Sequence, residues 1–194
     1  MCLRSLGEHR LPRSANKKEN RLRKFCVQRR ALCDGGAMST VTRATKMLEQ
    51  VGVAFSIHTY DYDADADRIG LQAAAALGER PERVLKTLMA LVDRKPVCAI
   101  VPSDHEVSMK RLAAAFGGKA AQMMAPADAE RVSGYKVGGI SPFGQMRKLP
   151  MAIEEQSLTN DLVYINGGQR GLQVRLDPKA ALEVLQAIAA PLVA

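Results

Sequence analysis

The spacing of apolar residues changes several times along this chain, and the changes predict helices and strands that follow one another closely. From Thr42 to Gly52 apolar side chains recur at three and four residues, which is the period of an amphipathic helix. Residues 53–60 then alternate and include β-branched and aromatic side chains, as a strand does. His58 and Tyr60 share one face of that strand.

Further helices are expected where a capping residue or an early proline precedes a helical apolar period, and strands where short apolar runs lie between turn residues. The expected helices are 69–77, 81–83, 109–116, 126–133 and 179–190, and the expected strands are 84–92, 97–102, 119–124, 149–153, 162–165 and 172–176. Turns at 93–96 and 166–168 are of the hairpin kind. The fold class is therefore α/β of the mixed α+β kind, with a mixed, partly antiparallel sheet and helices around it, not a doubly wound parallel sheet.

Charge divides the chain into two parts. Residues 1–37 hold ten Lys and Arg against three acids, and so carry +7 of the formal net charge of +8. We expect residues 1–37 to be a flexible basic N-terminal extension and residues 38–194 to be the folded domain. A leader, or translation from a start codon upstream of Met38, explains the extension better than an RNA-binding helix, because basic tails are common.

Cysteine use and hydropathy favour a cytoplasmic protein. Three of the four cysteines lie in residues 1–37, and Cys98 lies in an apolar run, where it is expected to be a small buried hydrophobe. No spacing resembles a zinc site or a disulfide framework, so no metal is expected. No apolar run approaches the length of a membrane span, and no signal peptide is recognised.

Two stretches carry candidate chemistry. Residues 134–144 hold four glycines in eleven positions. This composition fits a rigid loop whose backbone N–H groups face a polar or anionic group, and it equally fits an ordinary connecting loop. Lys86 interrupts the apolar strand 84–92, so its side chain either extends to the surface or faces a pocket. A lone histidine such as His58 fits a structural role.

Five motifs together resemble a known family. They are Ile57-His58-Thr59-Tyr60, Val84-Leu85-Lys86-Thr87-Leu88, the glycine segment 134–145, Arg147-Lys148-Leu149-Pro150, and Gly167-Gly168-Gln169-Arg170-Gly171-Leu172. In this order, residues 41–188 resemble the YbaK/EbsC family, and most closely its YbaK-type Cys-tRNA(Pro) deacylases. The extension 1–37 lies outside the resemblance.

The resemblance implies a fold, a reaction and partners. The fold is the barrel-like mixed sheet, surrounded by helices, that also serves as an editing domain of prolyl-tRNA synthetases. The reaction is trans-editing, in which cysteine is removed from mischarged Cys-tRNA(Pro). A second site is needed for this because cysteine fits a proline pocket, and binding alone does not separate the two amino acids by size. The implied partners are tRNA(Pro) and prolyl-tRNA synthetase in the cytoplasm, with no cofactor, membrane or DNA.

The resemblance also implies site residues. The expected catalytic residues are Lys86, Gly138 and Gly139, with the lysine cation and the backbone N–H groups stabilising the ester oxygen. The expected substrate-binding residues are Tyr60, Thr87, Ile140, Ser141, Pro142 and Gln173. Gln173 stands where the family can carry an acid, and it serves if only a hydrogen-bond partner is needed. Arg147 and Lys148 are expected to face the tRNA acceptor end.

The implied chemistry needs no protein nucleophile. The cysteine thiol of the substrate would attack its own ester and leave as a thiolactone, so the protein supplies positioning and an oxyanion site. Ser141 has no adjoining base and is not expected to act as a nucleophile. Two alternatives stay open: a deacylase for another misacylated tRNA such as Ala-tRNA(Pro), and a non-catalytic module that binds tRNA or a synthetase.

Overall fold

A computed structural model of the chain describes residues 39–63 and 69–194, and the extension expected at 1–37 lies outside them. The helices are α1 (Arg43–Gln50), α2 (Ile69–Leu77), α3 (Met109–Ala115), α4 (Pro126–Ser133) and α5 (Pro178–Leu185), with 3-10 turns η1 (Pro81–Arg83) and η2 (Glu155–Thr159). The strands are β1 (Phe55–Thr59), β2 (Val84–Val92), β3 (Lys95–Pro102), β4 (Ala121–Met123), β5 (Met151–Glu154), β6 (Val163–Asn166), β7 (Leu172–Leu176) and β8 (Ile188–Ala190).

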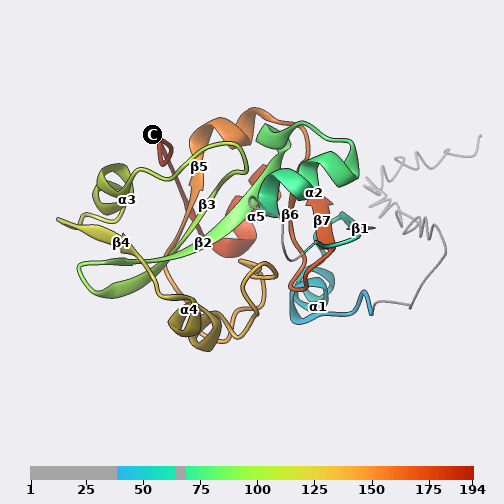
Figure 1. Cartoon of the computed structure of the whole chain (residues 1–194), viewed down its shortest axis with the longest axis horizontal. Coiled ribbons are helices and arrows are strands. Elements are labelled where there is room, and N and C mark those ends of the chain that lie inside the picture. Colours follow the sequence, from blue (N-terminus) through green and yellow to red (C-terminus); the bar gives the residue numbers. More distant parts are fainter. Residues whose placement is uncertain (1–38, 64–68) are drawn as a thin grey trace, which may run out of the picture.

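One mixed sheet joins the described strands in the order β1-β7-β6-β2-β3-β5-β8, and β4 pairs with β2 beside this path. The contacts of β2 with β6, β3 with β5 and β5 with β8 are parallel, and the others are antiparallel. Figure 1 shows β2 and β3 crossing the middle of the molecule, with α3 and β4 toward one end and β1, β7 and α2 toward the other. The mixed fold class predicted from the sequence is confirmed.

One edge of strand β2 is only partly paired with its neighbours in the sheet. On one edge it pairs with β3 along nearly its whole length, through a tight turn at Asp93 and Arg94. On its other edge it meets β6 only at Val84 and Leu85, and β4 only from Ala90 onward. The ladder therefore skips residues 86–89, and this break is where the cavity described below is found.

Apolar side chains fill both faces of the sheet. On one face Leu85, Ile100 and Ile165 pack with residues of α1, α4 and α5. The other face, including Ala90 and Val101, packs with α3. Cys98 is fully buried within the first of these clusters, as its sequence context predicts.

The C-terminal helix is shorter than the sequence predicts. The apolar pattern indicates a helix to Ala190, but α5 ends at Leu185, Gln186 takes a left-handed conformation, and β8 then pairs with β5. The buried carboxylate of Glu154 explains the change, because it accepts hydrogen bonds from the N–H groups of Leu192 (2.6 Å) and Val193 (3.0 Å). These bonds hold the chain beside β5, where strand pairing replaces helical bonds.

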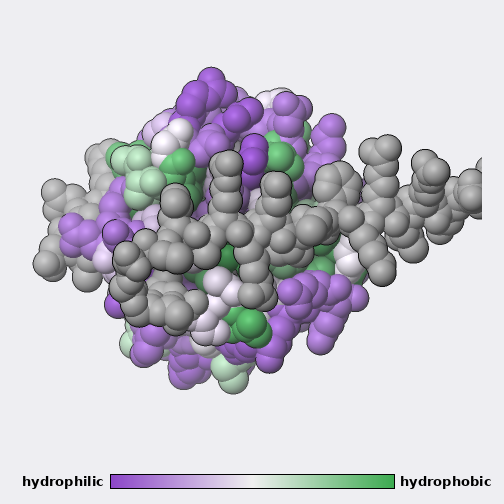
Figure 2. All heavy atoms as spheres, turned by 90° about the vertical axis from the view of Figure 1, so that its right-hand side faces the viewer, coloured by the Kyte–Doolittle hydropathy of each residue, from purple (hydrophilic) through white to green (hydrophobic). Residues whose placement is uncertain are grey.

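The face at the β1 end of the molecule is largely hydrophilic, with hydrophobic side chains in small groups where the surface is visible (Figure 2). In the described part of the chain, no helix has the length and apolar character needed to cross a membrane.

Candidate active site

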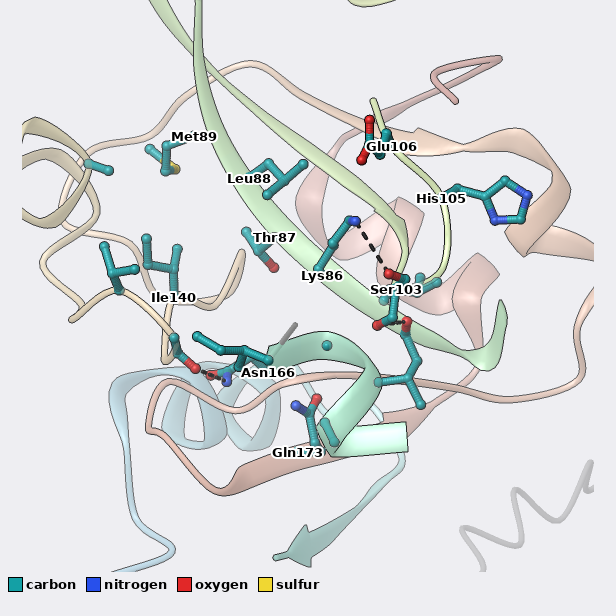
Figure 3. Close-up of a pocket in the computed structure, with 18 of the residues that line it drawn as sticks. Lys86, Thr87, Leu88, Met89, Ser103, His105, Glu106, Ile140, Asn166 and Gln173 are labelled. Carbon is teal, nitrogen blue, oxygen red and sulfur yellow. Dashed lines mark hydrogen bonds between the residues drawn. The ribbon is translucent and has the colours of Figure 1, made fainter. Parts of the chain in front are cut away.

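A cavity of about 600 Å³ opens at the unpaired edge of β2. Its walls come from α2, β2, the loop after β3, the start of α4, the glycine loop, and the ends of β6 and β7 (Figure 3). The volume lies in the range of small-molecule sites. The break in the β2 ladder thus becomes a pocket because elements distant in sequence surround it.

Six of the nine residues expected at the site line this cavity, and three do not. Those that line it are Tyr60, Lys86, Thr87, Gly138, Ile140 and Gln173. Gly139, Ser141 and Pro142 are not among the residues that line it. Ser141 is fully buried, and its hydroxyl accepts the N–H of Phe143 (3.2 Å), so the structure places it as a support of the loop.

The N–H of Gly139 is not placed as an oxyanion donor. It donates to the carbonyl of Lys136 (2.8 Å) and closes a turn in which Gly138 has a φ of 85°. A side chain at Gly139 would begin 2.9 Å from the backbone nitrogen of Arg170. Gly139 is therefore a glycine because another segment of backbone packs against it.

Lys86 extends from β2 along the wall of the cavity. Its Nζ donates to the carbonyl of Ser103 (3.3 Å), as Figure 3 shows. Ser103 is held in turn, because its Oγ donates to the carbonyl of Val84 (2.6 Å). The lysine side chain is partly buried. The hydrogen bond to the Ser103 carbonyl thus holds its cationic end beside the pocket.

The glycine loop is fixed over the cavity by the segment that follows β6. Asn166 Nδ2 donates to the carbonyl of Gly138 (3.2 Å), and Arg170 Nε donates to that of Val137 (2.9 Å). The guanidinium of Arg170 also lies 5.4 Å from the ring of Tyr62. The two central residues of the turn are therefore held from outside the loop.

Tyr135 and helix α1 hold the base of the same loop. The Tyr135 hydroxyl donates to the carbonyl of Phe143 (2.8 Å), near the far end of the loop. The guanidinium of Arg43 stacks 4.4 Å from the Tyr135 ring, and its Nη2 donates to the carbonyl of Gly134 (2.5 Å). A positive charge is favourable there because Gly134 ends α4, where helix carbonyls point outward.

Three side chains that line the cavity carry buried polar atoms without a hydrogen-bond partner. They are the Tyr60 hydroxyl, Thr87 Oγ1 and Gln173 Oε1. Gln173 lies beside the Tyr60 hydroxyl without meeting hydrogen-bond geometry, and burial is the main cause that raises the pKa of Tyr60. Since an unsatisfied buried polar atom costs about 1–3 kcal/mol, such a group points to a polar ligand.

The opposite wall of the cavity is apolar. Met89, Met124 and Ile140 are buried there, and Met123 is an exposed residue of the same lining. Methionine side chains are flexible and adapt to apolar groups of irregular shape. The cavity therefore has a polar and an apolar part.

The sequence reasoning missed the loop after β3 and Asn166. Ser103, Asp104, His105 and Glu106 all line the cavity, and Nδ1 of His105 lies 2.8 Å from the Asp104 carboxylate. The sequence signal that could have identified this loop is a polar run directly after a buried strand, because loop residues at strand ends often belong to binding or catalytic sites.

Arg147 and Lys148 do not line the cavity. Both are exposed, and Lys148 donates to Gln186 Oε1 (2.7 Å). Among the residues that the structure describes, no cluster of three or more His, Cys, Asp or Glu could hold a metal ion.

Comparisons with known proteins agree with this fold. A solved structure described as a trans-editing enzyme for prolyl-tRNA synthetase has a similar fold, with a TM-score of 0.72 and 21% identity over 82% of this chain and 99% of that chain. This likeness shows that the two chains share a fold. The model of the aminoacyl-tRNA editing domain family matches residues 65–184, and the chain belongs to that family.

Two curated relatives are similar over most of their length. EbsC of Enterococcus faecalis, named as a Cys-tRNA(Pro)/Cys-tRNA(Cys) deacylase, is 32% identical over 145 residues, which are 74% of this chain and 87% of that protein. ProXp-y of Escherichia coli K12, named as a multifunctional Ser/Thr-tRNA deacylase, is 24% identical over 148 residues, 76% of this chain and 89% of that protein. The resemblance drawn from the five motifs is confirmed.

Proposed function

We propose that this protein is a trans-editing aminoacyl-tRNA deacylase that removes cysteine from mischarged Cys-tRNA(Pro). The observation that carries the proposal is the cavity at the β2 edge, which joins the cation of Lys86, three unpartnered polar atoms and a methionine-lined wall. An aminoacyl ester has a carbonyl and an ammonium group for the polar part and a side chain for the apolar part. The name of the EbsC relative supports cysteine as the amino acid.

Lys86 and Gly138 are the proposed catalytic groups. The lysine ammonium stabilises negative charge on the ester oxygen, and the glycine loop lets the backbone approach the substrate closely. Tyr60, Thr87 and Gln173 orient the aminoacyl group, with Ile140 beside its side chain. Gly139 acts by shaping the loop.

The cleavage step uses the thiol of the substrate. Its sulfur forms a bond to the ester carbonyl carbon, the carbon–oxygen bond to the ribose breaks, the ribose oxygen takes up the thiol proton, and a thiolactone leaves. This route fits the described residues, in which Ser141 is held inside the loop and Cys98 is buried behind the wall. Burial raises the pKa of Cys98 to about 12, which keeps it a thiol.

The proposed partners are tRNA(Pro) and prolyl-tRNA synthetase, in the cytoplasm. Outside residues 1–37 the chain carries only +1 of the net charge, which is little for binding tRNA without help. A synthetase that holds tRNA(Pro) supplies the missing affinity. The similar solved structure is described as a trans-editing enzyme for prolyl-tRNA synthetase, which supports this partnership.

A substrate series tests the proposal. tRNA(Pro) charged with cysteine, alanine or serine is incubated with the protein, with and without prolyl-tRNA synthetase, and release of the labelled amino acid is followed. We expect cysteine to be released fastest and the synthetase to accelerate it. Faster release of alanine or serine would mean that the protein deacylates another misacylated tRNA. If no amino acid is released, the protein is a non-catalytic binding module.

A further inference from the structure

Two arginines, a histidine and a tyrosine continue the polar wall of the cavity over β1, β6, β7 and η1. We call Arg83, Arg175, His58 and Tyr164 the arginine patch. Tyr164 on β6 pairs with Arg175 on β7, two register positions from the pair Asn166 and Gln173 that lines the cavity. Residues two apart in a strand share a face and lie about 7 Å apart, so Gln173 and Arg175 follow one another on the same face.

Arg175 has no anionic partner among the described residues, and the ion pairs that the structure shows there do not include it. Its guanidinium carbon lies 5.6 Å from the centre of the Tyr164 ring, and its Nε is buried without an acceptor. A cation–π contact compensates such a cation only partly. An unpaired, half-buried guanidinium is thus suited to an external anion.

Arg83 stands beside the same tyrosine. Its Nη1 lies 3.8 Å from the Glu79 carboxylate, and its Nε is also buried without an acceptor. Glu79 also accepts the hydroxyl of Tyr164 (3.0 Å). One carboxylate therefore contacts one arginine and a tyrosine, and the two guanidinium groups leave the patch with an excess of positive charge.

The pKa of His58 reflects this excess of positive charge. Its ring contacts that of Tyr164 edge-on at 5.1 Å, and its Nε2 lies 2.9 Å from Ser56 Oγ. Burial is the main cause that lowers the pKa of His58, the Arg175 charge lowers it further, and Glu79 acts in the opposite direction. Of the two charged neighbours, the cation thus has the stronger influence on His58.

We propose that the arginine patch binds a backbone phosphate of the RNA strand whose aminoacylated end enters the cavity, an inference that rests on the proposed function. A guanidinium matches phosphate oxygens through paired N–H donors. Every nucleotide that leads into the cavity brings one negative charge, whereas the cavity holds only the terminal ester. The shared sheet face favours RNA over an acidic protein, because the patch begins where the cavity wall ends.

Binding can be measured without deacylation. The His58 ring signal, assigned by its loss in His58→Asn, is titrated with pH in the presence of the ribotrinucleotide CCA or of inorganic phosphate. We expect the trinucleotide to raise the pKa of His58 in the natural protein and not in Arg175→Gln. An unchanged pKa, an equal change in Arg175→Gln, or a response to inorganic phosphate alone would overturn the proposal.

Kinetics supply a second test. Arg175→Gln should raise KM for Cys-tRNA(Pro) about tenfold, the order expected for one charge-assisted hydrogen bond, and leave release from a cysteine ester of adenosine unchanged. The slope of log KM against log salt should fall by about one. Arg175→Lys should keep most of that slope.

The matched control is Arg131→Gln, since Arg131 is exposed on α4 and paired with Asp128 (2.7 Å). It should change neither KM nor the slope, and a change equal to that of Arg175→Gln would contradict a local phosphate site. If the natural protein releases no amino acid, the proposed function fails, while the titration of His58 still decides whether the patch binds phosphate.

Discussion

The contact between the glycine loop and the segment after β6 predicts a specific effect of Gly139→Ala. A Cβ at this position would lie 2.9 Å from the backbone nitrogen of Arg170 and 3.0 Å from the carbonyl carbon of Gln169. Non-bonded carbon contacts need about 3.5–4.0 Å, so the two backbone segments must separate by about 0.5 Å or more. Overpacking of this kind costs about 1–3 kcal/mol.

The shift would displace Gly138 at the cavity wall, and a displacement of about 1 Å can lower a rate by about 100-fold. We therefore expect Gly139→Ala to lower kcat/KM for Cys-tRNA(Pro) by about 10- to 100-fold. Gly117→Ala is the control, because Gly117 has a φ of 67° and open space around it, away from the cavity lining. That variant should be about 1 kcal/mol less stable than the natural protein and should keep its full activity. Full activity in a folded Gly139→Ala protein would refute the reasoning.

Three further predictions concern stability and reactivity. Glu154→Gln should lower the free energy of unfolding in urea by about 1–3 kcal/mol, because an amide offers one acceptor oxygen where the carboxylate offers two, and an unchanged value would contradict this. Cys98 should resist iodoacetamide at pH 8 until urea unfolds the protein, as peptide mass mapping will show, since it is buried with a pKa of about 12. The pKa of His58 lies below its ordinary 6.5, so its contribution to stability is present above that pH and lost as pH falls through the folded pKa. The melting temperature of His58→Asn should then fall less between pH 7.5 and pH 5 than that of the natural protein, and equal slopes would count against the shift.

Local sequence signals predicted most of the elements because their causes are local. Thr42 and Ser108 accept backbone N–H groups at the starts of α1 and α3, as their positions before helical patterns indicate. The apolar run 84–92 is a strand with the predicted bounds. Caps and periodicity depend on neighbours in the chain, and these are visible in one sequence.

Tertiary contacts decided what the sequence pattern did not. The sequence pattern predicted that the last helix reaches Ala190, which is wrong. Residues 188–190 instead pair with β5 as β8, and this pairing depends on Glu154, a residue about 35 positions away that a local pattern does not reveal. The cavity likewise depends on the incomplete pairing of β2, which no local pattern reveals.

The candidate site residues show the same difference between local sequence signals and tertiary contacts. Lys86 and Gly138 were found through motifs, and the structure places both in the cavity lining. Ser141 stands in the same motif but supports the loop, and motif membership alone does not separate these two roles. The patch residue Arg175 carried no motif, since its significance lies in an unpaired charge beside Tyr164.

The most direct test of the account is the rate at which Lys86→Ala releases cysteine from Cys-tRNA(Pro). Loss of one donor to a developing oxyanion lowers kcat by about 100- to 1,000-fold. We expect a loss of that size while the melting temperature stays close to that of the natural protein, because Lys86 is partly exposed and makes a long contact of 3.3 Å to Ser103. Cysteine release at the natural rate from the folded variant would contradict the assignment of this cavity as the site of deacylation.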